Sequence, residues 1–190
     1  MENNILELIK TRRSIRKFKS TKVSKENLNS IIEAGLYAPT SANAQPWHFT
    51  VIQNQELINE LNEDVKEAIR NSDLSPQAKK AAEIEGFSFF YHAPTLILVS
   101  EEDNTNEFSK KSDVAVASQN MMLQAHALGL GSCWIGAVSV LFDRSDNDKY
   151  MEMFNIPKGF TPSHAIIVGE KESNLTQAPK RRENTVNFID

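Results

Sequence analysis

The sequence predicts a single α+β domain, because helical periodicity and strand-like apolar runs both recur along it. The helical patterns cover residues ~25–37, 57–69 and 113–128, and the apolar runs cover 94–100 and 165–168. At 190 residues the chain is long enough for one substantial core, and a domain of this size buries roughly 70% of the surface that its unfolded chain exposes. No repeat or low-complexity linker divides the sequence. We therefore expect residues 1–190 to form one folded unit.

Composition and charge exclude several classes of protein. The formal net charge of −4 gives no general attraction to nucleic acid, and no apolar run approaches the ~18–20 residues that a membrane span needs. The single cysteine, Cys133, excludes an intrachain disulfide. Together with a start that lacks the pattern of a secretory leader, it predicts a protein of the reducing cytoplasm. We expect no nucleic-acid partner and no membrane partner.

The first segment predicts a short helix that ends in a basic cluster. Ile5, Leu6 and Ile9 have the spacing of one helical face. The basic residues of the segment are Lys10, Arg12, Arg13, Arg16, Lys17 and Lys19. Arginine binds phosphate oxygens in bidentate fashion, so the cluster is a candidate phosphate site. The alternative is a solvated face whose charges balance the C-terminal dipole of the helix.

A long polar loop separates the helix at 25–37 from a strand that runs through His48–Ile52. Ser24 is the expected N-cap of the helix and Pro39 its stop. A helix-to-strand connection needs only two to six residues, and this one uses about ten. Its polar side chains are Thr40, Ser41, Asn43 and Gln45. Amide groups suit the edge of a planar heteroaromatic ring; the alternative is that they cap the helix and bond their own backbone.

Two helices and an aromatic cluster follow. The stripe Leu57, Ile58, Leu61, Val65 and Ile69 predicts a core-facing helix that starts near Asn54 or Gln55. Ser75 and Pro76 predict the N-cap and first residue of the next helix, which runs toward Gly86. The aromatic residues are Phe87, Phe89, Phe90 and Tyr91. They either line a substrate pocket or belong to the core or an interface, and the pattern leaves both open.

The second half predicts two buried strands and a long helix. Residues 94–100 and 165–168 are unbroken apolar runs, which are typical of strands covered on both faces. The helix at 113–128 ends at Gly129 in C′ geometry. His126 is expected to be a packing or interface residue, because no His, Cys or carboxylate stands four residues away to share a metal. Tyr150, Met153 and Phe154 predict a further short helical face.

Glycines in the stretch 129–136 allow the backbone to approach a ligand closely. The sequence has no GxGxxG or Walker pattern, so it predicts neither a Rossmann nor a P-loop site. Nothing near Cys133 lowers its pKa or serves as its base, so we expect a structural thiol. Neither a catalytic triad nor metal-ligand spacing is present in the sequence.

Five blocks of the sequence together resemble the nitroreductase family, the FMN-dependent NAD(P)H oxidoreductases. In the family's order they are Arg12–Arg16, the loop PTSANAQPWHF at 39–49, Gly129–Gly136, Ile156–Pro157 with Gly159, and Lys180–Arg182. They cover nearly the whole chain. The resemblance implies an α+β fold with a central, mostly antiparallel sheet flanked by helices. It also implies an intertwined homodimer that holds FMN at the subunit interface.

The resemblance further implies which residues bind FMN. They are Arg12, Arg13, Ser14, Arg16, Pro39, Thr40, Ser41, Asn43, Gln45, Ile135, Gly136, Ala137, Lys180 and Arg182. Arg12 faces the phosphate, together with Lys180 and Arg182, whereas Arg16 lies nearer the flavin pyrimidine. The loop meets the flavin of the neighbouring subunit, and the backbone of 135–137 runs beside the reactive N5. Residues 186–189 are candidates for an added edge strand, in this subunit or its partner.

The implied activity is hydride transfer from NADH or NADPH, through the flavin, to a nitroaromatic, quinone or similar acceptor in a ping-pong cycle. The best-known branch has an acidic residue before the glycine of the 135–137 stretch, and this sequence does not, so the substrate preference of that branch is not carried over. Two alternatives stay open. One is dehalogenase-like or flavin-degrading chemistry on the same scaffold, and the other is a non-catalytic flavin-binding module.

Overall fold

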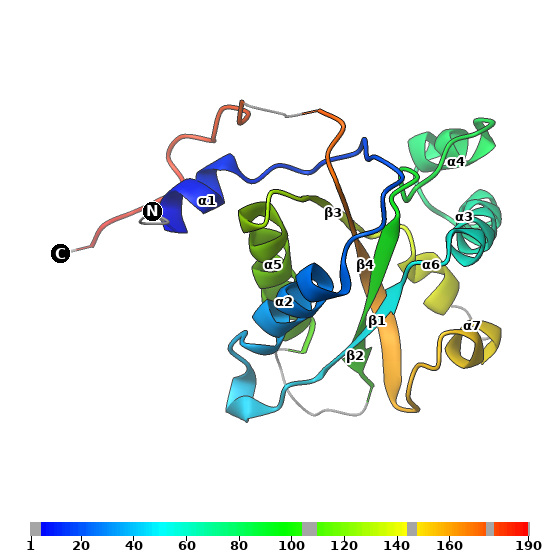
Figure 1. The fold of residues 1–190 in the computed structure, drawn as a ribbon, viewed down its shortest axis with the longest axis horizontal. Coiled ribbons are helices and arrows are strands. Elements are labelled where there is room, and N and C mark those ends of the chain that lie inside the picture. The colour runs from blue at the N-terminus through cyan, green and yellow to red at the C-terminus, as the bar shows by residue number, and fades with distance from the viewer. Residues whose placement is uncertain (1–4, 104–109, 144–147, 174–176, 190) are drawn as a thin grey trace.

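The computed structural model describes residues 5–103, 110–143, 148–173 and 177–189. Four strands form one sheet, and helices cover both of its faces (Figure 1). One face carries α2 (Lys25–Leu36) and α5 (Lys110–Ala127), and the other carries α3 (Gln55–Arg70), α4 (Pro76–Glu83), α6 (Ser139–Phe142) and α7 (Asp148–Met153). The sheet therefore separates two apolar cores, and the predicted α+β class is confirmed.

The sheet is antiparallel throughout. Its strands are β1 (Trp47–Ile52), β2 (Thr95–Glu102), β3 (Gly131–Ile135) and β4 (Phe160–Gly169), in the spatial order β1-β2-β4-β3. The inner strands β2 and β4 are fully buried over residues 96–99 and 165–168. These are the two runs in which the sequence shows no alternation, as expected for strands covered on both faces. The predicted central, mostly antiparallel sheet is confirmed.

Three predicted helix starts are confirmed by their caps. The side chain of Ser24 accepts a hydrogen bond from the backbone N–H of Asn27, and Asn54 accepts from those of Glu56 and Leu57. Ser75 caps α4 in the same way, with Pro76 as its first residue. A helix leaves its first N–H groups without internal partners, so each cap fixes a boundary locally.

The end of α5 carries the predicted glycine C-cap. Gly129 has φ +80°, the left-handed conformation that glycine adopts without strain. Its N–H donates to the carbonyl of His126 at 3.0 Å, and the N–H of Leu130 donates to that of Ala125 at 2.9 Å. These two bonds make a Schellman motif, and the chain passes from it directly into β3.

The stretch 129–136 differs from the expectation. Residues Gly131–Ile135 form an edge strand, β3, paired with β4, whereas the sequence predicts only a close approach of glycine backbone to a ligand here. Cys133 and Ile135 face one core, while Ser132 and Trp134 point to the α5 face. The period of two is present in the sequence, but the run is short and its glycines are atypical of strands. The short helix α6 was also not predicted.

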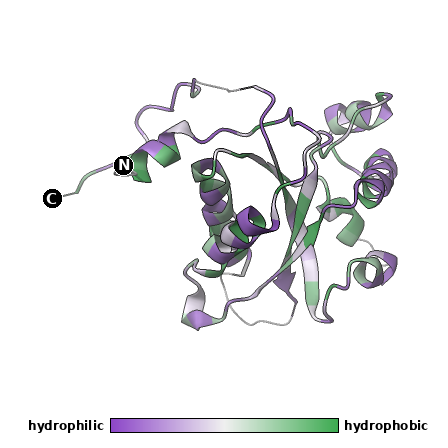
Figure 2. Ribbon diagram, viewed as in Figure 1, coloured by the Kyte–Doolittle hydropathy of each residue, from purple (hydrophilic) through white to green (hydrophobic). Residues whose placement is uncertain are grey.

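The two ends of the described chain expose apolar side chains. The predicted first helix is present as α1 (Ile5–Thr11), yet Ile5, Leu6 and Ile9 are 71%, 53% and 48% exposed. Figure 2 shows this apolar colouring on α1, which lies beside α5 and the C-terminal tail. Residues 177–189 contain no strand within this chain, and Phe188 is 91% exposed. Among the described helices, none has both the length and the apolar character needed to cross a membrane.

Candidate functional site

The basic segment after α1 runs beside the first residues of β3. Ser14 forms a parallel bridge with Ser132, whose carbonyl accepts a hydrogen bond from the N–H of Ile15 at 3.0 Å. Gly131 makes this approach possible, since a Cβ there would lie 2.9 Å from the Cβ of Ile15. It would also lie 2.8 Å from the Cγ of Lys171. The glycine of β3 thus sets how closely the arginine segment follows the edge of the sheet.

An open concavity of about 370 Å³ is built from the two ends of the chain. Its lining residues are Arg12, Arg13, Ser14, Arg16, Gln177, Pro179 and Arg181. Four of these are arginines, and this lining includes no carboxylate. Arginine is always protonated in proteins, so the concavity carries several positive charges and suits an anion with several oxygen atoms.

Two donors in this arginine cluster are buried without a partner. They are Nη1 of Arg12 and Nε of Arg13. Arg13 is fixed by a bond from its Nη1 to the carbonyl of Arg12 at 2.5 Å. Burial lowers the pKa of Arg12, an effect that Cys133 opposes and Arg13 reinforces. A buried donor without an acceptor costs about 1–3 kcal/mol, and more when it is charged. A phosphate at the concavity would bring acceptor oxygens to the two guanidinium groups that carry these donors.

The polar loop lies elsewhere in the chain. Pro39, Ser41, Asn43 and Gln45 are exposed, and the loop sits at the end of α2 far from the arginine segment (Figure 1). Its side chains bond one another: Gln45 donates from Nε2 to Oδ1 of Asn43 at 3.1 Å, and Oγ1 of Thr40 accepts from the N–H of Gln45 at 3.2 Å. The structure therefore does not bring the loop and the arginines together within one chain.

The loop also holds unusual backbone. Ala42, Asn43 and Gln45 have φ values of +48°, +57° and +49°, in the left-handed region that costs a non-glycine residue about 1–3 kcal/mol. Such conformations concentrate at binding sites, where the surrounding structure holds them in place. The loop is polar and largely exposed, and its strained backbone is consistent with a binding role.

The far end of β3 supplies the third group of predicted residues. Ile135 is buried and pairs with Ala165, and Gly136 and Ala137 follow where the strand ends. The preceding Trp134 stacks on His164, with ring centroids 3.5 Å apart and planes 7° apart. Both rings line a second concavity of about 340 Å³. The edge of β3 thus runs from the arginine segment at one end to an aromatic platform at the other.

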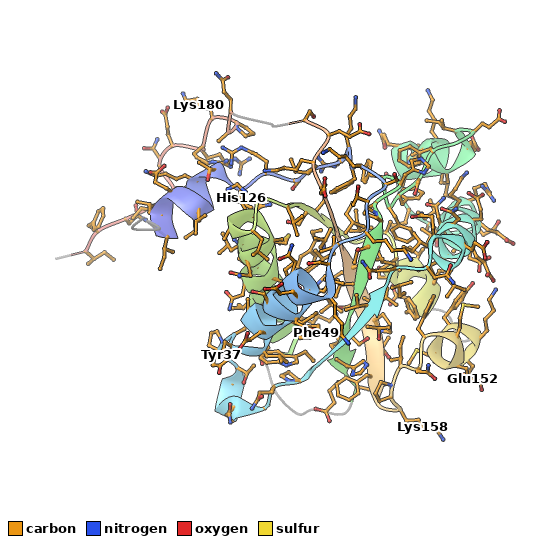
Figure 3. All side chains as sticks on the ribbon, in the orientation of Figure 1. Tyr37, Phe49, His126, Glu152, Lys158 and Lys180 are labelled. Carbon is orange, nitrogen blue, oxygen red and sulfur yellow. The ribbon has the colours of Figure 1, made fainter. Side chains whose placement is uncertain are left out.

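The basic tail residue that lines the concavity is not one of the two that were predicted, Lys180 and Arg182. Arg181 lines it, whereas Lys180 makes an exposed ion pair with Glu183 at 2.7 Å. Figure 3 shows Lys180 extended away from the protein. Arg182 is exposed and is not part of the lining. The roles predicted for Lys180 and Arg182 stay predictions, and Arg181 joins them as a candidate.

Comparison with known proteins identifies the family. Residues 9–170 match the model described as the nitroreductase family. The chain belongs to the nitroreductase family. The matched residues include the arginine segment, the polar loop and β3, but not the tail that carries Arg181.

Individual nitroreductases resemble this chain over most of its length. A crystal structure of a nitroreductase with bound FMN from Bacteroides fragilis NCTC 9343 is 33% identical, with a TM-score of 0.89, and the match covers 99% of this chain and 100% of that one. An FMN-dependent nitroreductase from Clostridium difficile R20291 is 29% identical, with a TM-score of 0.80 and coverage of 99% and 100%. A Methanothermobacter thermautotrophicus protein, provisionally named NADH dehydrogenase/NAD(P)H nitroreductase, is 31% identical over 90% of this chain and 79% of its own length.

Several residues that line or border the arginine concavity were not predicted from the sequence. Gln177, Pro179 and Arg181 lie in an irregular tail, where no periodicity indicates which side chains turn inward. Among the aromatic residues, Phe90 is fully buried and belongs to the core. Tyr91 instead lies under Arg16, whose guanidinium carbon is 5.7 Å from the ring centroid. This contact extends the arginine cluster toward the partly buried Phe87 and Phe89, which pack on each other edge to face.

Proposed function

We propose that this nitroreductase binds FMN and uses NADH or NADPH to reduce a nitroaromatic, quinone or similar small-molecule acceptor. The observation that carries the proposal is the pair of buried, unpartnered donors on Arg12 and Arg13 beside an arginine-lined concavity. FMN ends in a phosphate of nearly two negative charges, which matches these donors. The family membership and the FMN-bound relative from Bacteroides fragilis support the same cofactor.

The residues proposed to hold FMN divide by the part of the cofactor that they recognise. Arg12 and Arg13 bind the phosphate through charge-assisted hydrogen bonds, with Arg181, Lys180 and Arg182 contributed by the tail. Ser14 and Arg16 follow on the same segment, and the positive charge of Arg16 favours a reduced, anionic flavin. The backbone of Ile135, Gly136 and Ala137 offers N–H groups at the end of β3.

We also propose a homodimer in which the polar loop of one copy completes the site of the other. The polar loop lies far from the arginine segment of its own chain (Figure 1). The simplest way to bring a loop and an arginine segment together is to take the loop from a second copy. The loop residues concerned are Pro39, Thr40, Ser41, Asn43 and Gln45. The exposed apolar stripe of α1 borders a groove of about 320 Å³ between α1, α2 and α5. An apolar surface of this kind is typical of a protein–protein interface.

When bound, FMN would supply the redox chemistry, which is hydride transfer from NADH or NADPH to the acceptor by a ping-pong cycle in a single cleft. The protein's residues orient the ring, place charge near its pyrimidine and exclude water. No side-chain nucleophile is required. Cys133 is buried in β3 and donates only weakly to the carbonyl of Trp134, so it has a structural role in this proposal.

The remaining expectations are also part of the proposal. Residues 1–190 form one domain, since both cores are built on the same sheet. The protein acts in the reducing cytoplasm, with neither nucleic acid nor membrane as a partner. A net charge of −4 and a buried free thiol support these statements.

An anaerobic titration tests the proposed activity. Purified protein is saturated with FMN, and NADH or NADPH is added while the flavin absorbance is followed. We expect bleaching with at least one nucleotide and recovery of the absorbance when a quinone or nitroaromatic compound is added. Protein that does not take up FMN contradicts the proposed cofactor. Protein that binds FMN but is not bleached by either nucleotide is a flavin-binding module, and the proposed activity is then wrong.

A further inference from the structure

His126 connects the long helix to the start of the arginine cluster. It lies in the last turn of α5, at the end nearest the basic segment (Figure 3). Its Nε2 is 2.9 Å from Oγ1 of Thr11, which is itself 2.6 Å from the carbonyl oxygen of Glu7. That carbonyl can only accept, so the single hydroxyl proton of Thr11 points to it. Oγ1 of Thr11 therefore accepts from Nε2–H of His126, which fixes the tautomer.

Thr11 is the last residue of α1, and Arg12 follows it directly. The hydrogen bond from His126 thus holds the point at which the chain leaves α1 and enters the arginine cluster. Nδ1 of His126 is unprotonated in this tautomer and can take up a proton while Nε2–H continues to hold Thr11. The same side chain can therefore position the segment in two charge states.

The described charged residues that line the cavity beside His126 are all cationic. It lines a small cavity of about 20 Å³ with Thr11, Arg12, Arg13, Ile15, Leu130, Ser132 and Lys171. The charged groups come from the segment after α1 and from Lys171, the second residue after β4, and among these lining residues none is acidic. Burial lowers the pKa of His126, and Lys171, Arg12 and Arg13 lower it further. Without an anion nearby, the imidazole is neutral at pH 7.

The small cavity and the arginine concavity share two lining residues. Arg12 and Arg13 line both. A cavity of about 20 Å³ has room for only about one water, so the phosphate belongs in the larger concavity. A phosphate bound in the larger concavity neutralises the guanidinium charges of Arg12 and Arg13, which otherwise oppose protonation of His126.

We propose that His126 is a proton-linked positioning residue of the phosphate site, holding Thr11 through Nε2–H and taking up a proton at Nδ1 when a phosphate group binds Arg12 and Arg13. The inference rests on the proposed FMN site and adds a residue and a proton to it. By linkage, FMN binds more tightly as the pH falls through the range between the pKa of His126 in the free and the bound protein. The phosphate's own second pKa of about 6 acts in the opposite direction.

Two substitutions separate positioning from proton uptake. His126→Gln keeps an N–H donor near the place of Nε2 but cannot titrate, whereas His126→Leu removes the donor as well. At about pH 8, where His126 is neutral, we expect His126→Gln to bind FMN within about twofold of the wild-type affinity. His126→Leu should bind about threefold to tenfold more weakly, as expected for the loss of one hydrogen bond. At about pH 6 the FMN affinity of His126→Gln should be at least about threefold lower than that of the wild type.

Calorimetry measures the proton directly. FMN is titrated into wild-type protein and into His126→Gln in two buffers of different ionisation enthalpy, and the difference in heat gives the protons taken up. We expect uptake in the wild type near neutral pH and a clear reduction in the variant. Riboflavin, which lacks the phosphate, should bind without the extra uptake. His92→Gln is the matched control, because His92 contacts the carbonyl of Gly86 and lies outside both cavities.

The outcomes distinguish the two proposals. Wild-type protein that does not bind FMN overturns the proposed function, and the inference with it. Normal FMN binding with equal pH dependence and equal proton uptake in the wild type and His126→Gln overturns the inference alone. The same holds if riboflavin shows the full uptake, because the proton is then not linked to the phosphate.

Discussion

Arg12 carries a guanidinium group that is partly buried within the chain. Its Nη1 is buried without an acceptor, and burial lowers its pKa. We therefore predict that Arg12→Leu leaves the free energy of unfolding of the FMN-free protein unchanged or higher by up to about 2 kcal/mol. FMN affinity should fall at least about tenfold, the equivalent of one lost charge-assisted hydrogen bond.

Urea denaturation without FMN and a fluorescence titration with FMN check the two halves of this prediction. Lys10→Leu is the control, because Lys10 makes only an exposed ion pair with Glu7, and such pairs contribute little. An Arg12→Leu variant that unfolds more easily and binds FMN normally would show that the guanidinium stabilises the fold instead.

His164 should make stability depend on pH. Its Nε2–H donates to Oγ of Ser118 at 2.7 Å, since Ser118 donates its own proton to the carbonyl of Val114. His164 is 3% exposed, and burial lowers its pKa to about 3. In the unfolded chain the pKa is about 6.5. Between these two pKa values His164 is protonated in the unfolded chain and neutral in the folded one. The free energy of unfolding therefore falls as the pH drops from about 6.5 toward 3.

We predict that His164→Gln, which keeps a donor for Ser118 but does not titrate, has a flatter dependence of unfolding free energy on pH in this range. The variant is expected to be less stable than the wild type at pH 7, because it loses the stack on Trp134. Urea midpoints measured between about pH 7 and 4 give both slopes. Parallel slopes for the two proteins would contradict a neutral, buried His164.

At the level of elements, two neighbouring glycines should have separate effects. A Cβ on Gly131 would meet the stiff side chain of Ile15 at 2.9 Å, so Gly131→Ala should displace the arginine segment, lower stability and weaken FMN binding. A Cβ on Gly129 would meet nothing within 4 Å. Gly129→Ala should therefore cost only its left-handed backbone, about 1–2 kcal/mol, with FMN affinity unchanged.

Urea denaturation and FMN titration of both variants test this contrast. The comparison is well matched, since Gly129 lies only two residues before Gly131, the first residue of β3, and both receive the same methyl group. If Gly129→Ala weakens FMN binding as much as Gly131→Ala, the effect comes from β3 as a whole and not from its contact with Ile15.

Elements with local signals were predicted well, and elements defined by distant contacts were not. The caps at Ser24, Asn54 and Ser75, and the glycine at 129, each act within a few residues, so the sequence reveals them directly. The strand β3 is short and begins with a glycine, and it is a strand because β4 pairs with it. The inward turn of Arg181 likewise depends on the concavity that it meets. The alternation in β3 is too short to indicate a strand by itself, and the irregular tail has no periodic pattern.

The whole molecule should be a dimer whose assembly is linked to FMN. Ile9 on α1 is 48% exposed and faces outward with Ile5 and Leu6. We predict that Ile9→Glu shifts the protein toward monomers and weakens FMN binding at the same time, because the loop of the second copy is then lost from the site. Ligand bound only by the dimer stabilises it by mass action, so added FMN should partly restore the dimer.

Sedimentation velocity with and without FMN gives the oligomeric state, and the same samples give the affinity. Leu74→Glu is the control, since Leu74 is similarly exposed, at 43%, but lies between α3 and α4. A wild-type monomer that binds FMN, or an Ile9→Glu variant that stays dimeric, would contradict the proposed assembly.

The strand order also determines when the site can form during synthesis. The arginine segment leaves the ribosome early, yet it pairs with Ser132 of β3 and, through Phe18, with Lys171 after β4. β3 in turn has only β4 as its strand neighbour in the described sheet. Contacts so distant in sequence close late in folding, and here they cannot close before about nine-tenths of the chain has been made. A nascent chain interrupted before residue 160 lacks β4, and its arginines have no sheet edge on which to assemble.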